Sequence, residues 1–146
     1  MKLATLRTGF GTSAIRIDGD NVGVELDYED VGQLLCSEDW HKAAQLSGEP
    51  VVFDHADLEA VVPNPGKIIC VGLNYAKHIR EMGREFPEHP TLFIKFADAL
   101  TGPYDDVFIP EFATQKLDYE GELAVIIGER AHRVNRNEAL DYVAGY

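Results

Sequence analysis

The segment KLDYEGELAVIIG, residues 116–128, constrains the fold most, because its chemical character changes along its length. Glu120 and Glu122 stand two residues apart near its start, and apolar residues follow from Leu123 to Ile127. Side chains two apart on a strand point to the same face, so the two carboxylates share a face. Apolar residues on both faces after them predict a strand that is buried on both sides.

The acidic pair needs compensation, because like charges on one strand face repel and a buried charge without a partner is costly. Two interpretations remain open from the spacing alone. Either Glu120 and Glu122 project into solvent at a strand end, or a divalent cation such as Mg²⁺ or Mn²⁺ lies between them. Two carboxylates are few for such a site, so the second interpretation requires a third acidic ligand from elsewhere.

Composition and charge exclude several classes of protein. The chain of 146 residues is 45% hydrophobic and 26% charged, which is typical of a globular domain. Its net charge of −12 argues against a nucleic-acid surface, which needs clustered Lys and Arg. No apolar run approaches the ~20 residues of a membrane span, and the N-terminus lacks a signal-peptide pattern, so we expect a cytoplasmic protein. Cys36 and Cys70 lie in apolar settings without a CxxC motif, and we expect buried, reduced thiols.

The first part of the chain is predicted to be a small β-containing domain. Apolar and polar residues alternate in 1–7 and 12–17, and the DGDN sequence at 18–21 predicts a hairpin turn. Helical spacing follows over 30–46, where the SED sequence can split the helix in two. Residues 51–53 read as a short strand.

A proline-rich junction at Pro63, Pro65 and Gly66 separates two sequence patterns. We therefore expect a small N-terminal domain over 1–61 and the beginning of a second, incomplete domain over 62–146. The chain ends shortly after its last predicted helix with no closing strand, which suggests a fragment. The elements expected in the second part are strands at 67–73 and 91–96, a helix at 74–83 with Asn74 as cap and Gly83 as stop, and a helix beginning at Asn135.

The helix predicted at 74–83 carries His78 and Glu81, which are three residues apart and therefore lie on one face. A carboxylate can orient a histidine as a general base, although a solvent-facing pair explains the same spacing. The polar loop that follows, 84–90, suits a mobile lid. Lys95 stands within the apolar strand LFIKF, where it either reaches solvent at a strand edge or binds an anion.

Several motifs in series resemble the fumarylacetoacetate hydrolase family, and they cover nearly everything after residue 62. They are PGKIICVGLNYAKHIREM (65–82), PTLFIKF (90–96), ALTGPYDDVFIP (99–110), LDYEGELAVIIG (117–128) and ALDYVAGY (139–146). The resemblance implies an α+β, β-rich fold of mixed sheets with short helices, preceded by a small N-terminal β-containing domain.

The resemblance also implies roles for five residues. Glu120 and Glu122 correspond to two metal ligands, His78 and Glu81 to a water-activating pair on a lid, and Lys95 to a substrate-binding lysine. The metal implied is Mg²⁺ or Mn²⁺, with Ca²⁺ as a further possibility, and a third acidic ligand is expected beyond residue 146. The partners implied are a small oxo-acid substrate and a second copy of the chain in a homodimer, with no nucleic acid and no membrane.

The activity that the resemblance implies is hydrolysis of a carbon–carbon bond in a 2,4-dioxo acid through a metal-stabilised enolate. An isomerase of the 2-hydroxyhepta-2,4-diene-1,7-dioate type and an oxaloacetate-type decarboxylase are alternatives on the same site. Leu73 replaces an arginine of some acylpyruvate-cleaving members, and Phe96 stands where proline often follows the lysine, so the substrate stays open. A binding module without catalysis is the alternative from another class.

Overall fold

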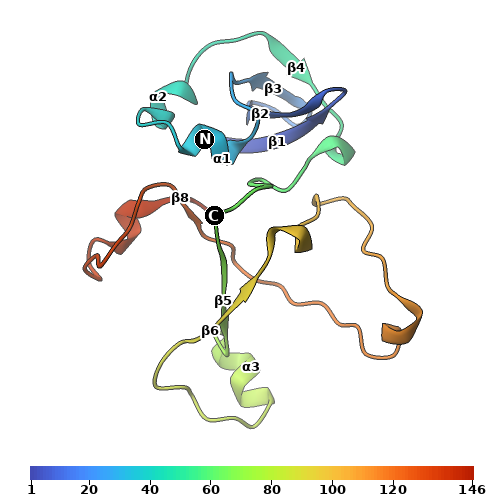
Figure 1. The fold of residues 1–146 in the computed structure, drawn as a ribbon, viewed down its shortest axis with the longest axis vertical. Coiled ribbons are helices and arrows are strands. Elements are labelled where there is room, and N and C mark those ends of the chain that lie inside the picture. Colours follow the sequence, from blue (N-terminus) through green and yellow to red (C-terminus); the bar gives the residue numbers. More distant parts are fainter. The chain divides into compact units, whose positions relative to one another are not determined.

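The structure is a computed structural model that describes all residues from 1 to 146, and it divides into two compact units. The first unit combines residues 1–62 with 101–146, and the second comprises residues 63–100. The domain boundary expected after residue 61 stays a prediction. The fold class is confirmed, since the chain consists of small sheets with short helices (Figure 1).

The N-terminal part of the first unit is a four-stranded antiparallel sheet in the order β1-β2-β3-β4 (Figure 1). The alternation predicted from the sequence forms β1 and β2, and the DGDN turn is confirmed between β2 and β3. Two backbone hydrogen bonds close that turn, from the N–H groups of Asp18 and Gly19 to the carbonyl of Val22. The strands are β1 (Lys2–Thr8), β2 (Gly11–Ile17), β3 (Val22–Glu25) and β4 (Pro50–Val52).

The predicted split of the first helical region is also confirmed. Helix α1 (Val31–Leu35) begins at Asp30, whose Oδ1 accepts a hydrogen bond of 2.8 Å from the N–H of Gln33. Helix α2 (Trp40–Ala43) follows, and the 3₁₀ turn η1 (His55–Asp57) comes after β4.

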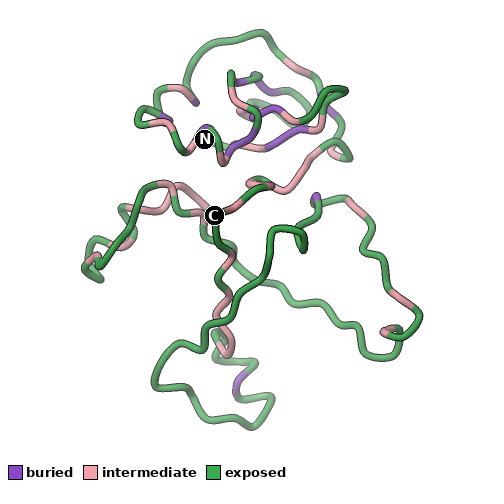
Figure 2. The backbone as a smooth tube through the Cα atoms, viewed as in Figure 1, coloured by how far each residue is buried: buried purple, intermediate pink, exposed green.

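Two buried apolar clusters hold the N-terminal sheet, and they use neighbouring residues of β2 because successive strand side chains point to opposite faces. One cluster is formed by Ala14, Leu26, Val31, Leu34, Trp40 and Ala44, and the other by Leu6, Ile15 and Phe53. Figure 2 shows buried residues gathered in this part of the chain. Ala144, near the end of the chain, packs against the first cluster.

Replacing Leu34 by Ala is expected to lower the free energy of unfolding of the first unit by about 2–5 kcal/mol, because Leu34 is fully buried. Trp40 is the only tryptophan and lies in the same cluster, so its fluorescence during urea unfolding measures the change directly. Leu46→Ala is the matched control, since Leu46 is 59% exposed and should change stability by less than about 0.5 kcal/mol. Equal losses in both variants would contradict the assigned core.

The turn at residues 101–105 is fixed to β1 by the guanidinium group of Arg7. Arg7 Nη1 and Nη2 donate to the two carboxylate oxygens of Asp105 at 2.7 and 2.5 Å, and Nε donates to Glu59 Oε2 at 2.8 Å. The N–H of Gly102 donates to Asp105 Oδ2 at 2.7 Å. Tyr104 stacks on His55 with ring centroids 5.7 Å apart. These contacts tie residues far apart in sequence to one sheet.

Acid is expected to release this turn. The hydrogen bonds from Arg7 come first among the causes that hold the pKa of the Asp105 and Glu59 carboxyls below their ordinary values. The folded chain therefore binds fewer protons than the unfolded chain at acidic pH. The stabilisation that Asp105 and Glu59 contribute is complete above about pH 4, the ordinary pKa of a carboxyl group, and it is lost as the pH falls through their lowered pKa values. The protection of the Gly102 amide, which is its exchange rate relative to that of an unfolded chain at the same pH, should fall over that interval. Asp105→Asn should show low protection already at neutral pH, and native protection in that variant would contradict the assigned hydrogen bonds.

The second unit is a β-hairpin with one helix. Strands β5 (Ile68–Gly72) and β6 (Thr91–Lys95) pair antiparallel with Ile68 opposite Lys95, which confirms both predicted strands. Helix α3 (Ala76–Glu81) lies between them, and η2 (Ala97–Ala99) follows β6. The prediction of Asn74 as helix cap was wrong, because the helix begins later and Tyr75 occupies the cap position without a side-chain cap bond.

The chain from residue 106 onward differs most from expectation. The strand predicted within residues 116–128 is reduced to β7 (Ile126–Ile127). The helix predicted from Asn135 is replaced by η4 (Ala139–Tyr142) and β8 (Val143–Gly145). Strand β8 pairs with β7, so the expectation that no strand closes the chain was also wrong. A further 3₁₀ turn, η3 (Glu111–Ala113), precedes this region.

The reason for the missing strand is visible in the exposure of residues 117–125 (Figure 2). All residues from 117 to 125 are exposed, Tyr119 at 90% among them, so neither face of the segment is covered, and no strand of this chain pairs with it. A strand needs a neighbour to satisfy its backbone groups. The burial predicted for this segment was therefore wrong within these 146 residues.

The prediction of two buried thiols was also wrong. Cys36 is exposed and Cys70 is half-buried, although both cysteines are free.

Candidate functional site

Helix α3 presents the residues predicted as a general base and its orienting acid. The helix ends in two hydrogen bonds typical of a glycine-terminated helix, from Gly83 N–H to the Arg80 carbonyl and from Arg84 N–H to the Ile79 carbonyl, both about 3 Å long. Gly83 has φ +63°, which confirms it as the stop. Ile79 is buried and anchors the helix.

His78 and Glu81 are both exposed on this helix, and no hydrogen bond joins them. The carboxylate of Glu81 instead lies 3.9 Å from the ammonium of Lys77. Pairing of His78 with Glu81 therefore requires Glu81 to leave Lys77, which an exposed pair allows at small energetic cost. The catalytic roles of both residues stay predictions.

The turn that leads into this helix carries backbone strain. Leu73 has φ +54°, in the left-handed region that costs a side-chain-bearing residue about 1–2 kcal/mol. Leu73 is also the residue that departs from some acylpyruvate-cleaving members. Strain in the turn before the helix that carries His78 is a feature that the sequence alone does not reveal.

The loop after the helix is held by the guanidinium of Arg80, which lies 5.3 Å from the centre of the Phe86 ring.

Lys95 closes strand β6 and is exposed. Because residues opposite each other in an antiparallel pair share a face, Lys95 lies on the same face of the hairpin as Ile68. It forms no ion pair with another residue of the chain, so its ammonium is available to an anion. Substrate binding by Lys95 stays a prediction.

Glu120 and Glu122 are both exposed and lie outside any strand. Neither carboxylate forms an ion pair or a hydrogen bond with another residue, whereas Asp118 accepts the N–H of Tyr119 at 2.9 Å. Two unpaired carboxylates fit Mg²⁺ or Mn²⁺ as donors, because these ions prefer oxygen ligands. No group of three or more His, Cys, Asp or Glu side chains in the chain is arranged to hold a metal, so the pair is a partial donor set.

The five predicted residues belong to different units. His78, Glu81 and Lys95 lie in residues 63–100, and Glu120 and Glu122 in the unit that includes 101–146. Sequence reasoning missed the contacts of Arg7 with Glu59 and Asp105, which fix the turn at residues 101–105. Arg7 and Asp105 are 98 residues apart, and no local pattern signals such a contact.

Comparison with known proteins identifies the family. Residues 67–146 match the family described as fumarylacetoacetate (FAA) hydrolase C-terminal, and this chain belongs to that family. Among solved structures, one from Mycobacterium smegmatis that carries the name HpcE is similar with a TM-score of 0.77 and 26% identity over 99% of this chain and 52% of the other. One from Mycobacterium abscessus has a TM-score of 0.70 and 27% identity, covering 100% and 53%.

Curated relatives are more similar in sequence. Oxaloacetate tautomerase YisK of Bacillus subtilis (strain 168) is 49% identical over 92 residues, which are 61% of this chain and 31% of the relative. The mitochondrial oxaloacetate tautomerase FAHD2A of Bos taurus is 45% identical over 87 residues, 60% of this chain and 27% of the relative. A fumarylacetoacetate hydrolase domain-containing protein 2 homolog of Dictyostelium discoideum is 37% identical over 117 residues, 77% and 38%. The chain thus spans about a quarter to two fifths of these relatives.

Proposed function

We infer that the protein containing this chain is a divalent-metal-dependent enzyme that tautomerises a 2-oxo acid of the oxaloacetate type. The observation that carries this inference is the 49% identity to a relative named as an oxaloacetate tautomerase, within a chain that belongs to the fumarylacetoacetate hydrolase family. The arrangement of the chain's own side chains supports it further.

Glu120 and Glu122 are the residues of this chain that would hold Mg²⁺ or Mn²⁺, because both carboxylates are exposed and have no partner in the chain. Bound there, the ion would stabilise negative charge that develops on the 2-oxo oxygen. The third acidic ligand is expected from outside residues 1–146.

His78 is the group that would move the proton. Tautomerisation transfers one proton between C3 of the oxo acid and the oxygen on C2, so it needs one side chain that accepts and returns a proton. The His78 imidazole is exposed and has no hydrogen bond that would occupy it. Activation of water for hydrolysis gains from an orienting carboxylate, and Glu81 is not bonded to His78 here. This arrangement favours tautomerisation over hydrolysis.

Lys95 would bind a carboxylate of the substrate. The chain has a net charge of −12, so an anionic substrate is repelled at long range and needs a local cation. Lys95 is an exposed ammonium without an ion-pair partner, on a strand that is paired to β5 along its whole length. A paired strand holds the charge at a defined position better than a loop does.

Hydrolysis of a 2,4-dioxo acid is the second candidate. The description of the matched family names a hydrolase, and the spacing of His78 and Glu81 fits a water-activating pair once Glu81 leaves Lys77. The isomerase and decarboxylase alternatives use the same residues.

A homodimer and a cytoplasmic location are also proposed here, although several animal relatives are named as mitochondrial. No helix of the structure has the length and apolar character of a membrane span.

The test uses the natural protein that carries this chain, purified and supplied with Mg²⁺ or Mn²⁺. Loss of the ultraviolet absorbance of enol-oxaloacetate measures tautomerisation, and loss of acylpyruvate absorbance measures hydrolysis. We expect a metal-dependent acceleration of the first reaction that exceeds the second, and its suppression by a chelator. Faster hydrolysis than tautomerisation would make hydrolysis the first candidate. If the protein catalysed neither reaction, the non-catalytic binding module would be favoured.

Replacing His78 by Ala is expected to lower the rate of tautomerisation by about 10²–10⁴-fold, which is the usual contribution of a positioned general acid–base. His89→Ala is the matched control, because His89 is an exposed histidine on the loop that follows the same helix. Glu81→Gln should slow acylpyruvate hydrolysis more than tautomerisation. Equal rates in the native protein and His78→Ala would contradict the assigned role.

A further inference from the structure

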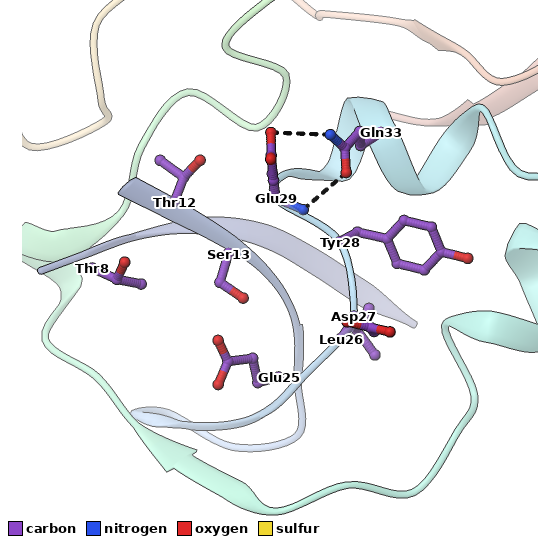
Figure 3. Close-up of a pocket in the computed structure, with 9 residues that line it drawn as sticks. All are labelled: Thr8, Thr12, Ser13, Glu25, Leu26, Asp27, Tyr28, Glu29 and Gln33. Carbon is purple, nitrogen blue, oxygen red and sulfur yellow. Dashed lines mark hydrogen bonds between the residues drawn. The ribbon is translucent and has the colours of Figure 1, made fainter. Parts of the chain in front are cut away.

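A polar pocket of about 290 Å³ lies on the N-terminal sheet, and none of its residues belongs to the proposed oxo-acid site (Figure 3). Its carboxylates, those of Glu25, Asp27 and Glu29, are exposed, and Glu29 accepts a hydrogen bond from the Gln33 amide. Water reaches these groups, so the pocket adds nothing to the proposed site. The feature that does bear on that site is the turn between β5 and α3.

This turn contains a residue in a left-handed conformation. Strand β5 ends at Gly72, which pairs with Thr91 of β6, and helix α3 begins at Ala76. Leu73 directly follows the paired strand and has φ +54°. Glycine adopts this conformation freely, whereas leucine adopts it at an energetic cost. Residues held in such conformations are concentrated at active sites and switch regions, where the surrounding structure maintains them.

The start of helix α3 has few other contacts that fix its direction. Tyr75 occupies the cap position without a side-chain cap bond, and Ile79 is the only buried residue of the helix. At the other end Gly83, with φ +63°, stops the helix, and the loop over 84–90 is exposed throughout. The direction in which α3 leaves the sheet therefore depends strongly on the backbone angles at Leu73.

The position of His78 follows from that direction, because His78 lies in the first turn of α3. A right-handed residue has φ of about −63°, so a change of hand at Leu73 would rotate the chain after it by more than about 100°. Such a rotation would displace the His78 imidazole by several ångströms. A displacement of about 1 Å can already cost a catalytic group about a hundredfold in rate.

We propose that Leu73 is a positioning residue for His78. Its left-handed backbone, and not a contact of its half-buried side chain, directs α3 so that the imidazole reaches the oxo acid. The strain at Leu73 is the energetic cost of this placement. The proposal rests on the proposed function, because it takes His78 as the group that moves the proton.

Four substitutions of Leu73 in the natural protein separate the backbone from the side chain. Proline holds φ near about −65° and excludes the left-handed region, and valine disfavours that region because it is branched at Cβ. Asparagine and glycine accept the region but lack the apolar side chain.

We expect kcat for tautomerisation to fall by about a hundredfold or more in Leu73→Pro and by about tenfold in Leu73→Val. KM should change by less than about threefold in both, because substrate binding by the metal and Lys95 is unaffected. Leu73→Asn and Leu73→Gly should keep kcat within about threefold of native, since both residues permit the left-handed turn.

Leu58→Val is the matched control and should keep native kcat, because Leu58 is also half-buried and has φ −71°, which valine accepts. Protection of the Met82 amide, which donates to the His78 carbonyl at 3.0 Å, shows whether α3 remains folded in each variant. Leu73→Val should keep native protection, so its lower kcat would reflect the placement of the helix and not its loss.

Native kcat in Leu73→Val, together with the expected loss in His78→Ala, would overturn the role of Leu73 and leave the proposed function intact. Equal losses of kcat in Leu73→Asn, Leu73→Gly and Leu73→Val would overturn it as well, because they would show that the side chain matters. Native turnover in His78→Ala would overturn both the proton transfer by His78 and its positioning by Leu73.

Discussion

Glu120→Gln is expected to reduce metal-dependent turnover of a 2-oxo acid by about a thousandfold or more. A bound divalent ion contributes several kcal/mol of charge stabilisation, and each 1.4 kcal/mol corresponds to a factor of ten. Glutamine keeps the size of the side chain but removes the charge that holds the ion. Glu122→Gln should have an effect of the same order, because the two carboxylates act on one ion. Steady-state rates at saturating Mg²⁺ measure both.

Glu111→Gln is the control for this experiment. Glu111 is exposed, lies on the same segment of the chain within η3 and carries no predicted role. Its variant should retain native activity. If Glu120→Gln lost no more activity than Glu111→Gln, the acidic pair would be a solvated surface feature, which is the other interpretation of its spacing.

Gly102→Ala is expected to release the turn at residues 101–105 from the N-terminal sheet. A Cβ at Gly102 would lie 2.5 Å from the backbone carbonyl oxygen of Leu58 and 3.0 Å from Asp105 Oδ2. Backbone cannot yield as the end of a flexible side chain can, so the turn must move and the paired hydrogen bonds between Arg7 and Asp105 must break. Overpacking of this kind costs about 1–3 kcal/mol. Urea unfolding and amide exchange at residues 102–105 measure the change.

Gly9→Ala is the matched control, because no atom lies within 4 Å of the position that its Cβ would take. Its stability should be native within about 0.5 kcal/mol. Native exchange rates in Gly102→Ala would contradict the close contact with Leu58.

The elements that sequence reasoning predicted correctly are those whose stabilising contacts are local. The alternation in β1 and β2 and the DGDN turn form one hairpin, and the hydrogen bonds from Asp18 and Gly19 to Val22 span only a few residues. The stop at Gly83 depends on its own φ angle. Local preference and local structure agree in these places, so a pattern of a few residues is sufficient.

The errors arise where a distant partner decides. The side chains of Asn135 and Glu138 bond to each other, with Asn135 Nδ2 donating to Glu138 Oε2 at 3.1 Å, and neither side chain accepts the backbone N–H that a capping box requires. The chain becomes extended at Val143, because Val143 pairs with Ile127 in the sheet of β7 and β8. Conversely, the apolar pattern at 117–125 lacks a neighbouring strand in this chain and remains exposed. A sequence pattern shows that a segment can form a strand, but whether the strand forms depends on a partner strand that the rest of the fold supplies.

The candidate site shows the same limit. The sequence placed His78 and Glu81 on one helix, and the structure does so as well, but the contact between Glu81 and Lys77 depends on rotamers that spacing does not specify. The strain at Leu73 and the contacts of Arg7 with Glu59 and Asp105 have no local pattern at all.

Binding of Mn²⁺ to the natural protein, followed by electron paramagnetic resonance of the free ion, tests whether Glu120 and Glu122 hold a divalent ion. We expect one saturable site per chain, whose affinity falls by at least about tenfold in Glu120→Gln and in Glu122→Gln. Glu111→Gln should bind Mn²⁺ as the native protein does. Unchanged Mn²⁺ affinity in both Glu120→Gln and Glu122→Gln would contradict the assignment of this pair as metal ligands.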